Sequence, residues 1–123
     1  MILVDTSVWV DHLRAGDALL QDLLDRERVL SHPFVIGELA LGSIPQRAAT
    51  LRQLNRLPSS IIARHDHVML LVDQQRLYSS GLSYVDVHLL AATRLTPEAT
   101  LWSRDKNLAA AAERLSLAAS VTH

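Results

Sequence analysis

Residues 2–14 read ILVDTSVWVDHLR, and this stretch is the strongest indication of the fold in the sequence. Its first three residues form a continuous apolar run, which is typical of a short strand buried on both faces of a parallel sheet. Val8, Trp9 and Leu13 then recur at helical spacing. The stretch therefore predicts a strand that leads directly into a helix, with Asp5 at the junction between them.

Length and composition limit the kind of protein that this sequence can encode. The 123 residues, 49% of them hydrophobic, are enough to form one domain, residues 1–123, with a sizeable core. We find no signal segment and no membrane-length apolar run, so we expect a soluble cytoplasmic protein. The absence of cysteine excludes disulfides and thiolate metal sites. The net charge of -1 gives no sign of a generally basic nucleic-acid binder.

Strand and helix signals alternate along the rest of the chain. Short strands are predicted at 28–32, 60–64 and 99–103, with a closing edge strand at 118–121; helices are predicted at 6–14, 17–27, 33–42, 45–56, 66–79, 83–95 and 106–115. This alternation predicts an α/β fold, a three-layer sandwich with a mostly parallel central sheet of four to five strands. Ligands bind such sheets at the carboxyl ends of the strands.

Four acidic residues occupy unusual positions in this predicted fold. Asp5 and Asp105 each follow a strand immediately, at the edge where ligands bind. Glu38 is the only charged residue in PFVIGELALG, residues 33–42. Asp86 has leucines at most of the positions three or four residues away on its helix. Two carboxylates at strand ends and two on apolar helix faces could therefore converge at one edge of the sheet.

Each acid also has a structural interpretation when it is taken alone. Asp5 and Asp105 could cap the helices that follow them, and Asp86 could complete a capping box with Ser83. Glu38 could pair with a buried arginine. Taken together, four converging carboxylates would repel one another, and a cation would relieve that repulsion. Oxygen ligands of this kind suit Mg²⁺ or Mn²⁺, which can activate a water molecule for hydrolysis of a phosphodiester bond.

Four segments together resemble the PIN-domain ribonucleases of the VapC toxin type. They are ILVDTSVWVDHLR (2–14), FVIGELALG (34–42), GLSYVDVHLLAATRL (81–95) and TLWSRDKNL (100–108). The resemblance covers nearly the whole chain and implies a PIN-like fold with a catalytic site formed by all four acids. It implies that Asp5 and Asp86 are the principal metal ligands. Glu38 and Asp105 would complete the pocket directly or through water.

Three smaller assignments accompany the four acids. Ser7 and Ser103 match hydroxyl positions beside the acids in the VapC type, and either could bind water or phosphate; Ser103 could equally be an ordinary strand-end residue. Arg104 is a candidate for contact with a phosphate, although a solvated arginine is equally compatible with the sequence. A stripe of leucines at 19, 20, 23 and 24 belongs to the core, and with Trp9 it could also supply a groove for an antitoxin helix.

The resemblance further implies particular partners and a cofactor. We expect Mg²⁺, with Mn²⁺ able to substitute, an RNA substrate, and a cognate VapB-type antitoxin whose C-terminal segment covers the site. We also expect a toxin homodimer and a hetero-oligomer with the antitoxin. The alternative is a PIN-like module that binds RNA or protein without catalysis. A phosphotransferase of the haloacid dehalogenase type is disfavoured, because Ser7 stands where that chemistry needs a second aspartate.

Overall fold

The computed structural model describes residues 1–121, and its centre is a small parallel sheet. The strands are β1 (Ile2–Val4), β2 (Val29–Leu30) and β3 (Thr100–Trp102), in the order β2-β1-β3. Ile2 pairs with Val29 on one side and with Thr100 on the other. Because β1 is central and all pairing is parallel, the carboxyl ends of β1 and β3 lie at the same edge.

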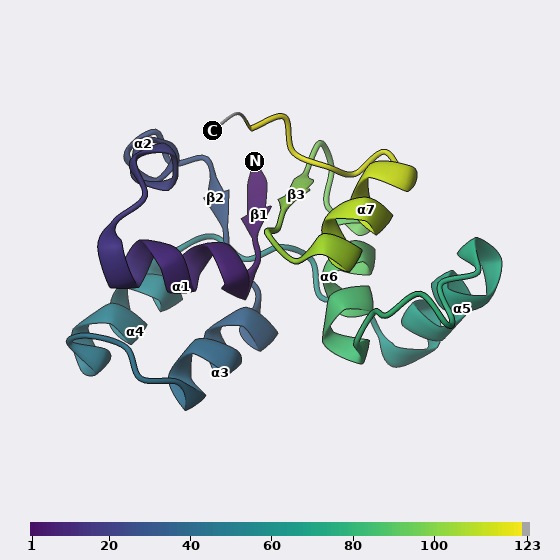
Figure 1. Cartoon of the computed structure of the whole chain (residues 1–123), viewed down its shortest axis with the longest axis horizontal. Coiled ribbons are helices and arrows are strands. Elements are labelled where there is room, and N and C mark those ends of the chain that lie inside the picture. Colours follow the sequence, from purple (N-terminus) through teal and green to yellow (C-terminus); the bar gives the residue numbers. More distant parts are fainter. Residues whose placement is uncertain (122–123) are drawn as a thin grey trace.

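Seven helices surround these strands in the described part of the chain. They are α1 (Thr6–Ala15), α2 (Ala18–Asp25), α3 (Pro33–Leu41), α4 (Arg47–Arg56), α5 (His65–Gln75), α6 (Tyr84–Leu95) and α7 (Lys106–Arg114). Figure 1 shows α1 to α4 grouped on the β2 side of the sheet and α5 to α7 on the β3 side. The alternation of strands and helices with a parallel sheet confirms the predicted α/β class.

The sheet is smaller than the sequence predicted, and both additional strands are wrong. Around residues 60–64 the described chain makes only one parallel bridge, between Ser31 and Ser59. The ladder stops there because the next amide on the neighbouring segment would be that of residue 33, and Pro33 has no amide hydrogen and begins α3. At the other edge a single bridge joins Leu101 to Ala118 where an edge strand over 118–121 was expected. The described chain therefore has three strands instead of four or five.

The helix boundaries follow from local capping. Asp17 caps α2 by accepting a hydrogen bond from the amide of Leu20 at 2.9 Å, as its position predicted. His32 caps α3 in the same way, with Nδ1 accepting from the amide of Phe34 at 3.0 Å. The predicted end of α5 at residue 79 is wrong. The helix stops at Gln75, because Arg76 takes a left-handed conformation with φ 53°.

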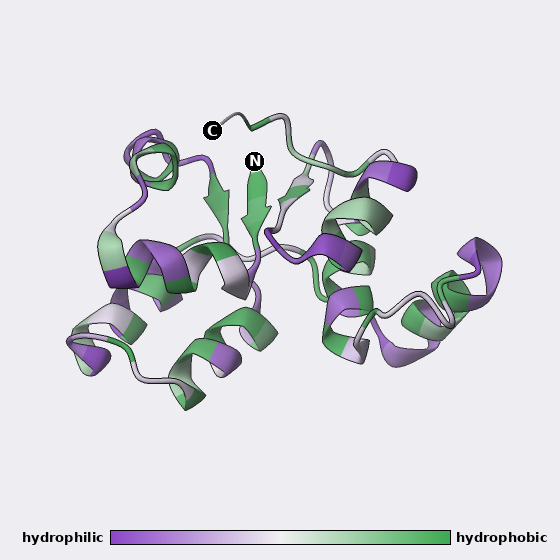
Figure 2. Cartoon of the chain, in the orientation of Figure 1, coloured by the Kyte–Doolittle hydropathy of each residue, from purple (hydrophilic) through white to green (hydrophobic). Residues whose placement is uncertain are grey.

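The core lies on and beside the strands. Leu3 and Val4 of β1 are fully buried, and Leu89 and Leu90 of α6 are buried with them. Figure 2 shows the hydrophobic residues of β1 and β2 in green, whereas the segment that leads from β3 into α7 is hydrophilic. Within residues 1–121, no helix has both the length and the apolar character that crossing a bilayer requires.

Candidate active site

Asp5 lies at the carboxyl end of the central strand and is only 6% exposed. Its carboxylate oxygen Oδ2 accepts two hydrogen bonds, one from Ser7 Oγ and one from Ser103 Oγ, each at 2.8 Å. Asp5 occupies the N-cap position of α1 but makes no capping bond with its side chain. The local interpretation of Asp5 as a helix cap is therefore wrong, and its carboxylate is held by hydroxyl groups from two different segments.

The short segment between β3 and α7 carries the second aspartate of the site. The amide of Asp105 donates to Ser103 Oγ at 3.0 Å, and the amide of Arg104 donates to Ser7 Oγ at 3.0 Å. Asp105 caps α7, with Oδ1 accepting from the amide of Leu108 at 2.9 Å. Ser7 and Ser103 thus join this segment to the start of α1, and the cap of Asp105 joins it to α7.

Asp86 lies in the first turn of α6 and completes a full capping box with Ser83. Its Oδ2 accepts from the amide of Ser83 at 2.9 Å, and the amide of Asp86 donates to Ser83 Oγ at 3.1 Å. Burial raises the pKa of the Asp86 carboxyl above its ordinary value, and the nearby charges of Asp105 and Asp5 raise it further, while the hydrogen bonds from Ser83 act in the opposite direction. Three aspartates from three separate segments therefore lie within electrostatic range of one another.

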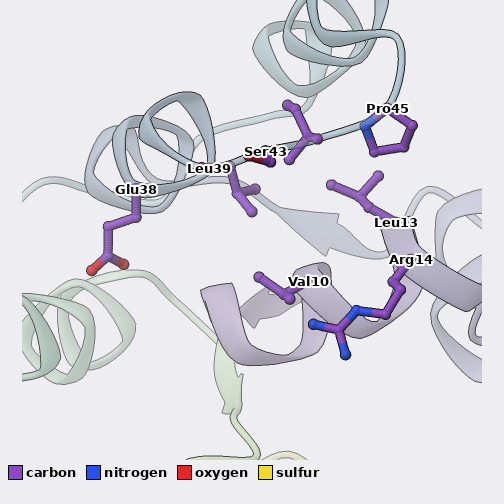
Figure 3. A pocket seen from close by; sticks show the side chains of 9 residues that line it. Val10, Leu13, Arg14, Glu38, Leu39, Ser43 and Pro45 are labelled. Atoms are coloured by element: carbon purple, nitrogen blue, oxygen red, sulfur yellow. The ribbon is translucent and has the colours of Figure 1, made fainter.

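Glu38 reaches the same region from α3. Thr6 Oγ1, one residue after Asp5, donates to Glu38 Oε1 at 2.6 Å. Glu38 is an exposed residue, so pairing with a buried arginine is wrong. It also lines one end of a cleft of about 530 Å³ between α1 and the segment that follows α3 (Figure 3), together with Val10, Leu13 and Pro45.

The four acids share one feature of bonding that suits a cation. Each commits one carboxylate oxygen to the bonds described above: Oδ2 of Asp5, Oε1 of Glu38, Oδ2 of Asp86 and Oδ1 of Asp105. In residues 1–121, no hydrogen bond within ordinary geometry reaches the second oxygen of any of them, which is left for another ligand. Carboxylate oxygens of this kind fit a hard divalent cation. However, no three acidic or histidine side chains of the described residues are already grouped as a metal site.

Helix geometry adds to the electrostatics of this region. Asp5, Asp86 and Asp105 stand in the N-cap position or first turn of α1, α6 and α7. The amino end of a helix carries a partial positive charge, which stabilises a nearby carboxylate. The capping interpretation of Asp86 and Asp105 is confirmed, and it is compatible with a site because each cap uses only one oxygen.

Arg104 and three residues outside the predicted set complete the local structure. The guanidinium of Arg104 pairs with Asp11 and Asp17. Neither of these acids was predicted to take part, although Asp17 was expected as a helix cap. Thr6 was also missed, and the only sequence signal for it is its position directly after Asp5. Nothing in the sequence indicated that Thr6 would meet Glu38, because the contact spans 32 positions.

A separate aromatic cluster lies between α3 and α6, with two buried histidines and an exposed tyrosine. His32, Phe34, His88 and Tyr84 form a row of edge-on ring contacts, with centroid separations of 4.6 Å for Phe34 with His88 and for His88 with Tyr84. His32 Nε2 and His88 Nδ1 are buried without a hydrogen-bond partner in residues 1–121. Burial lowers the pKa of His32 to about 4, with a smaller contribution from His88. Both histidines therefore stay neutral at pH 7.

Comparisons with known proteins agree with this arrangement. The sequence profile of the PIN domain matches residues 2–114. The chain is 51% identical over 111 residues to the protein named Ribonuclease VapC32 from two strains of Mycobacterium tuberculosis, CDC 1551 / Oshkosh and ATCC 25618 / H37Rv, and the match covers 90% of each chain. The chain belongs to the PIN-domain family. Within that family it is of the VapC type, the ribonuclease toxins of toxin-antitoxin systems.

Proposed function

We propose that this VapC-type protein is a divalent-metal-dependent endoribonuclease that hydrolyses RNA phosphodiester bonds at the pocket bounded by Asp5, Glu38, Asp86 and Asp105. The observation that carries the proposal is the electrostatic proximity of Asp86 to both Asp5 and Asp105, from three separate elements. A fold without a ligand gains nothing from placing like charges together, whereas a cation makes that arrangement favourable. A non-catalytic binding module would not need these acids and is not favoured.

Each acid has a part in the proposed site. Asp5 and Asp86 hold Mg²⁺, or Mn²⁺ in its place, through the oxygens that the fold leaves free, and Asp105 and Glu38 complete the shell directly or through water. When bound, such a cation neutralises phosphate charge and makes water a stronger nucleophile at neutral pH. Ser7 and Ser103 keep Asp5 in one orientation, because both donate to its Oδ2. Thr6 does the same for Glu38.

Incubation of the purified protein with structured RNA tests this function. We expect cleavage in Mg²⁺, no cleavage in chelator, and none with Asp5→Asn. The control variant is Asp22→Asn, which changes an exposed aspartate of α2 that pairs with Arg26 and should cleave normally. The cut ends should carry a 5′-phosphate and a 3′-hydroxyl, because water attacks the phosphorus directly. Undiminished cleavage in chelator, or 2′,3′-cyclic phosphate ends, would refute the mechanism.

We also propose that the protein is cytoplasmic and that its partner there is a VapB-type antitoxin. Trp9 and Leu24 line a cleft of about 280 Å³ between α1, α2 and α4, where an apolar helix could lie, and the antitoxin segment beyond that helix would cover the acids. Leu24→Lys should weaken the complex with the antitoxin in a pull-down without preventing RNA cleavage. An unchanged complex would place the antitoxin elsewhere.

A homodimer is the proposed assembly of the toxin. Ile62, Leu70 and Leu95 are apolar side chains that are 53%, 52% and 42% exposed. Leu70 of α5 and Leu95 of α6 line one shallow cleft, which a second copy could cover. Light scattering should give a dimeric mass for the natural protein and a monomeric mass for Leu70→Glu. Leu41→Glu, at an apolar residue that is 91% exposed on α3, is the control and should stay dimeric.

A further inference from the structure

The side chain of Arg104 connects three parts of the molecule. Its Nη1 donates to Asp11 Oδ2 of α1 at 2.7 Å, and its Nη2 donates to Asp17 Oδ2 at the start of α2. The guanidinium also lies over the ring of Trp102, 5.4 Å from the centroid. Its own backbone amide donates to Ser7 Oγ. Arg104 is therefore fixed both by its side chain and by its main chain.

The environment of these ion pairs distinguishes them from an ordinary surface pair. The side chains of Arg104 and Asp17 are 29% and 14% exposed, whereas those of Arg26 and Asp22, also an arginine-aspartate pair, are 70% and 50% exposed. The amide of Leu20 and the guanidinium of Arg104 lower the pKa of the Asp17 carboxyl, and Asp17 and Asp11 raise that of Arg104. Because Arg104 is partly buried and has two partners, its ion pairs should restrict the structure more than a solvated pair does, which contributes little to stability.

Because Arg104 lies between Ser103 and Asp105, its ion pairs can affect the candidate site. Only residues 103–105 separate β3 from α7, and all three take part in the site. Ser103 Oγ donates to Asp5 and accepts from the amide of Asp105. The amide of Arg104 donates to the other serine that holds Asp5. Any movement of the Arg104 backbone would therefore change the hydrogen bonds on both sides of Asp5.

We propose that Arg104 is a positioning residue, whose guanidinium, held between Asp11 and Asp17, fixes residues 103–105 so that Ser103 and Asp105 keep their places beside Asp5. This inference rests on the proposed function, since it assigns Arg104 to the geometry of that same site. It differs from the alternative that Arg104 binds a phosphate of the RNA. In the present arrangement the guanidinium is already engaged by two carboxylates.

Two variants and their combination separate these alternatives. Arg104→Gln removes the charge, whereas Asp11→Asn with Asp17→Ser removes both partners and leaves Arg104 in place. Serine keeps the N-cap of α2, so the fold is preserved. We expect each variant to lower kcat about tenfold with little change in KM, as for other residues that orient ligating groups. The combined variant should be no worse than either one, because all of them break the same connection.

A phosphate-binding Arg104 predicts the opposite pattern. Arg104→Gln would then raise KM and reduce the dependence of cleavage on salt, while removal of Asp11 and Asp17 would free the guanidinium and improve RNA binding. That result would overturn the positioning role. Arg26→Gln is the matched control, because Arg26 also pairs with an aspartate but is exposed at the end of α2, and it should change neither parameter.

Amide hydrogen exchange of the metal-free protein gives a readout that needs no activity. The amides of Arg104, Asp105 and Leu108 donate to Ser7, Ser103 and Asp105, and all three should exchange faster in both the Arg104 and the Asp11/Asp17 variants. Unchanged exchange in the Asp11/Asp17 variant would refute the positioning role, even where Arg104→Gln folds poorly. Because this measurement is independent of RNA, a natural protein that failed to cleave would contradict the proposed function alone.

Discussion

Ser7 and Ser103 are 96 positions apart in the chain, and both donate a hydrogen bond to the same oxygen, Oδ2 of Asp5. One hydroxyl comes from the first turn of α1 and the other from the residue that follows β3. The shared acceptor ties the two segments together and leaves Oδ1 of Asp5 available. The orientation of the Asp5 carboxylate thus depends on a contact between two segments far apart in the chain.

Replacing either serine by alanine should weaken metal binding without unfolding the protein. Ser7→Ala and Ser103→Ala each remove one of the two bonds that orient Asp5, and we expect the Mg²⁺ concentration for half-maximal cleavage to rise about tenfold. The measurement is a Mg²⁺ titration of RNA cleavage, with Ser120→Ala, an exposed serine, as control. An unaltered titration for both variants would mean that Asp5 is oriented by other contacts.

Thr6→Val should lower activity and leave stability nearly unchanged. Valine keeps the volume of threonine but removes the hydroxyl that donates to Glu38 Oε1, so Glu38 loses its fixed orientation. Because this bond is solvent-exposed, its loss should change the free energy of unfolding by less than about 1 kcal/mol. Cleavage rates and thermal melting of the two proteins test this. A melting temperature that falls as steeply as the activity would indicate a structural role for the bond.

Asp86→Asn should abolish cleavage while the metal-free protein becomes equally or more stable. Asparagine can still accept from the amide of Ser83, so the capping box loses little, and the repulsion by Asp5 and Asp105 is removed. Because the pKa of Asp86 is raised in the fold, protonation of this group adds stability to the natural protein as the pH falls, and the asparagine variant should lack that gain.

Thermal melting with chelator and with millimolar Mg²⁺ checks the Asp86 prediction. A cation that binds only the folded state raises the melting temperature, and loss of a ligand should reduce that rise. A clear loss of metal-free stability, together with an unchanged response to Mg²⁺ and intact cleavage, would make Asp86 a structural cap only.

Acid should destabilise this protein through His32. The unfolded chain binds a proton at an ordinary histidine pKa near 6.5, whereas buried His32 does so only near 4. The unfolded state therefore binds more protons between these values, and stability falls as the pH falls through this window. For this group alone, about 2 kcal/mol should be lost between pH 7 and pH 5.

Denaturant titrations at pH 7 and pH 5 measure this loss. His32→Asn keeps an acceptor at the N-cap of α3 and removes the titration, so its stability should change less between the two pH values. Equal losses in the natural protein and the variant would show that other groups, such as His88, cause the acid sensitivity.

The sequence predicted best what depends on local pattern. The run at 2–4, the cap at Asp17 and the box of Ser83 with Asp86 are set by neighbouring residues, and all are confirmed. The predicted strand at 60–64 failed because its pairing depends on a distant segment, which turns into α3 at Pro33 after a single bridge. The interpretation of the site had the same limit. The four acids could be selected by their unusual positions in the sequence. The contacts of Thr6 with Glu38 and of Arg104 with Asp11 and Asp17 arise only in the tertiary fold, so the sequence did not indicate them.

The central place of β1, between β2 and β3, has a consequence during synthesis of the chain. On the proposed site, residues 1–79 supply Asp5 and Glu38, and the rest supplies Asp86 and Asp105, so neither part alone carries the full set. Most of the chain would emerge from the ribosome before β3 could pair with β1 and bring Ser103 next to Asp5. If the proposed site is correct, the nascent chain would not cleave RNA until Asp105 had emerged, which leaves an interval in which an antitoxin already present could bind first.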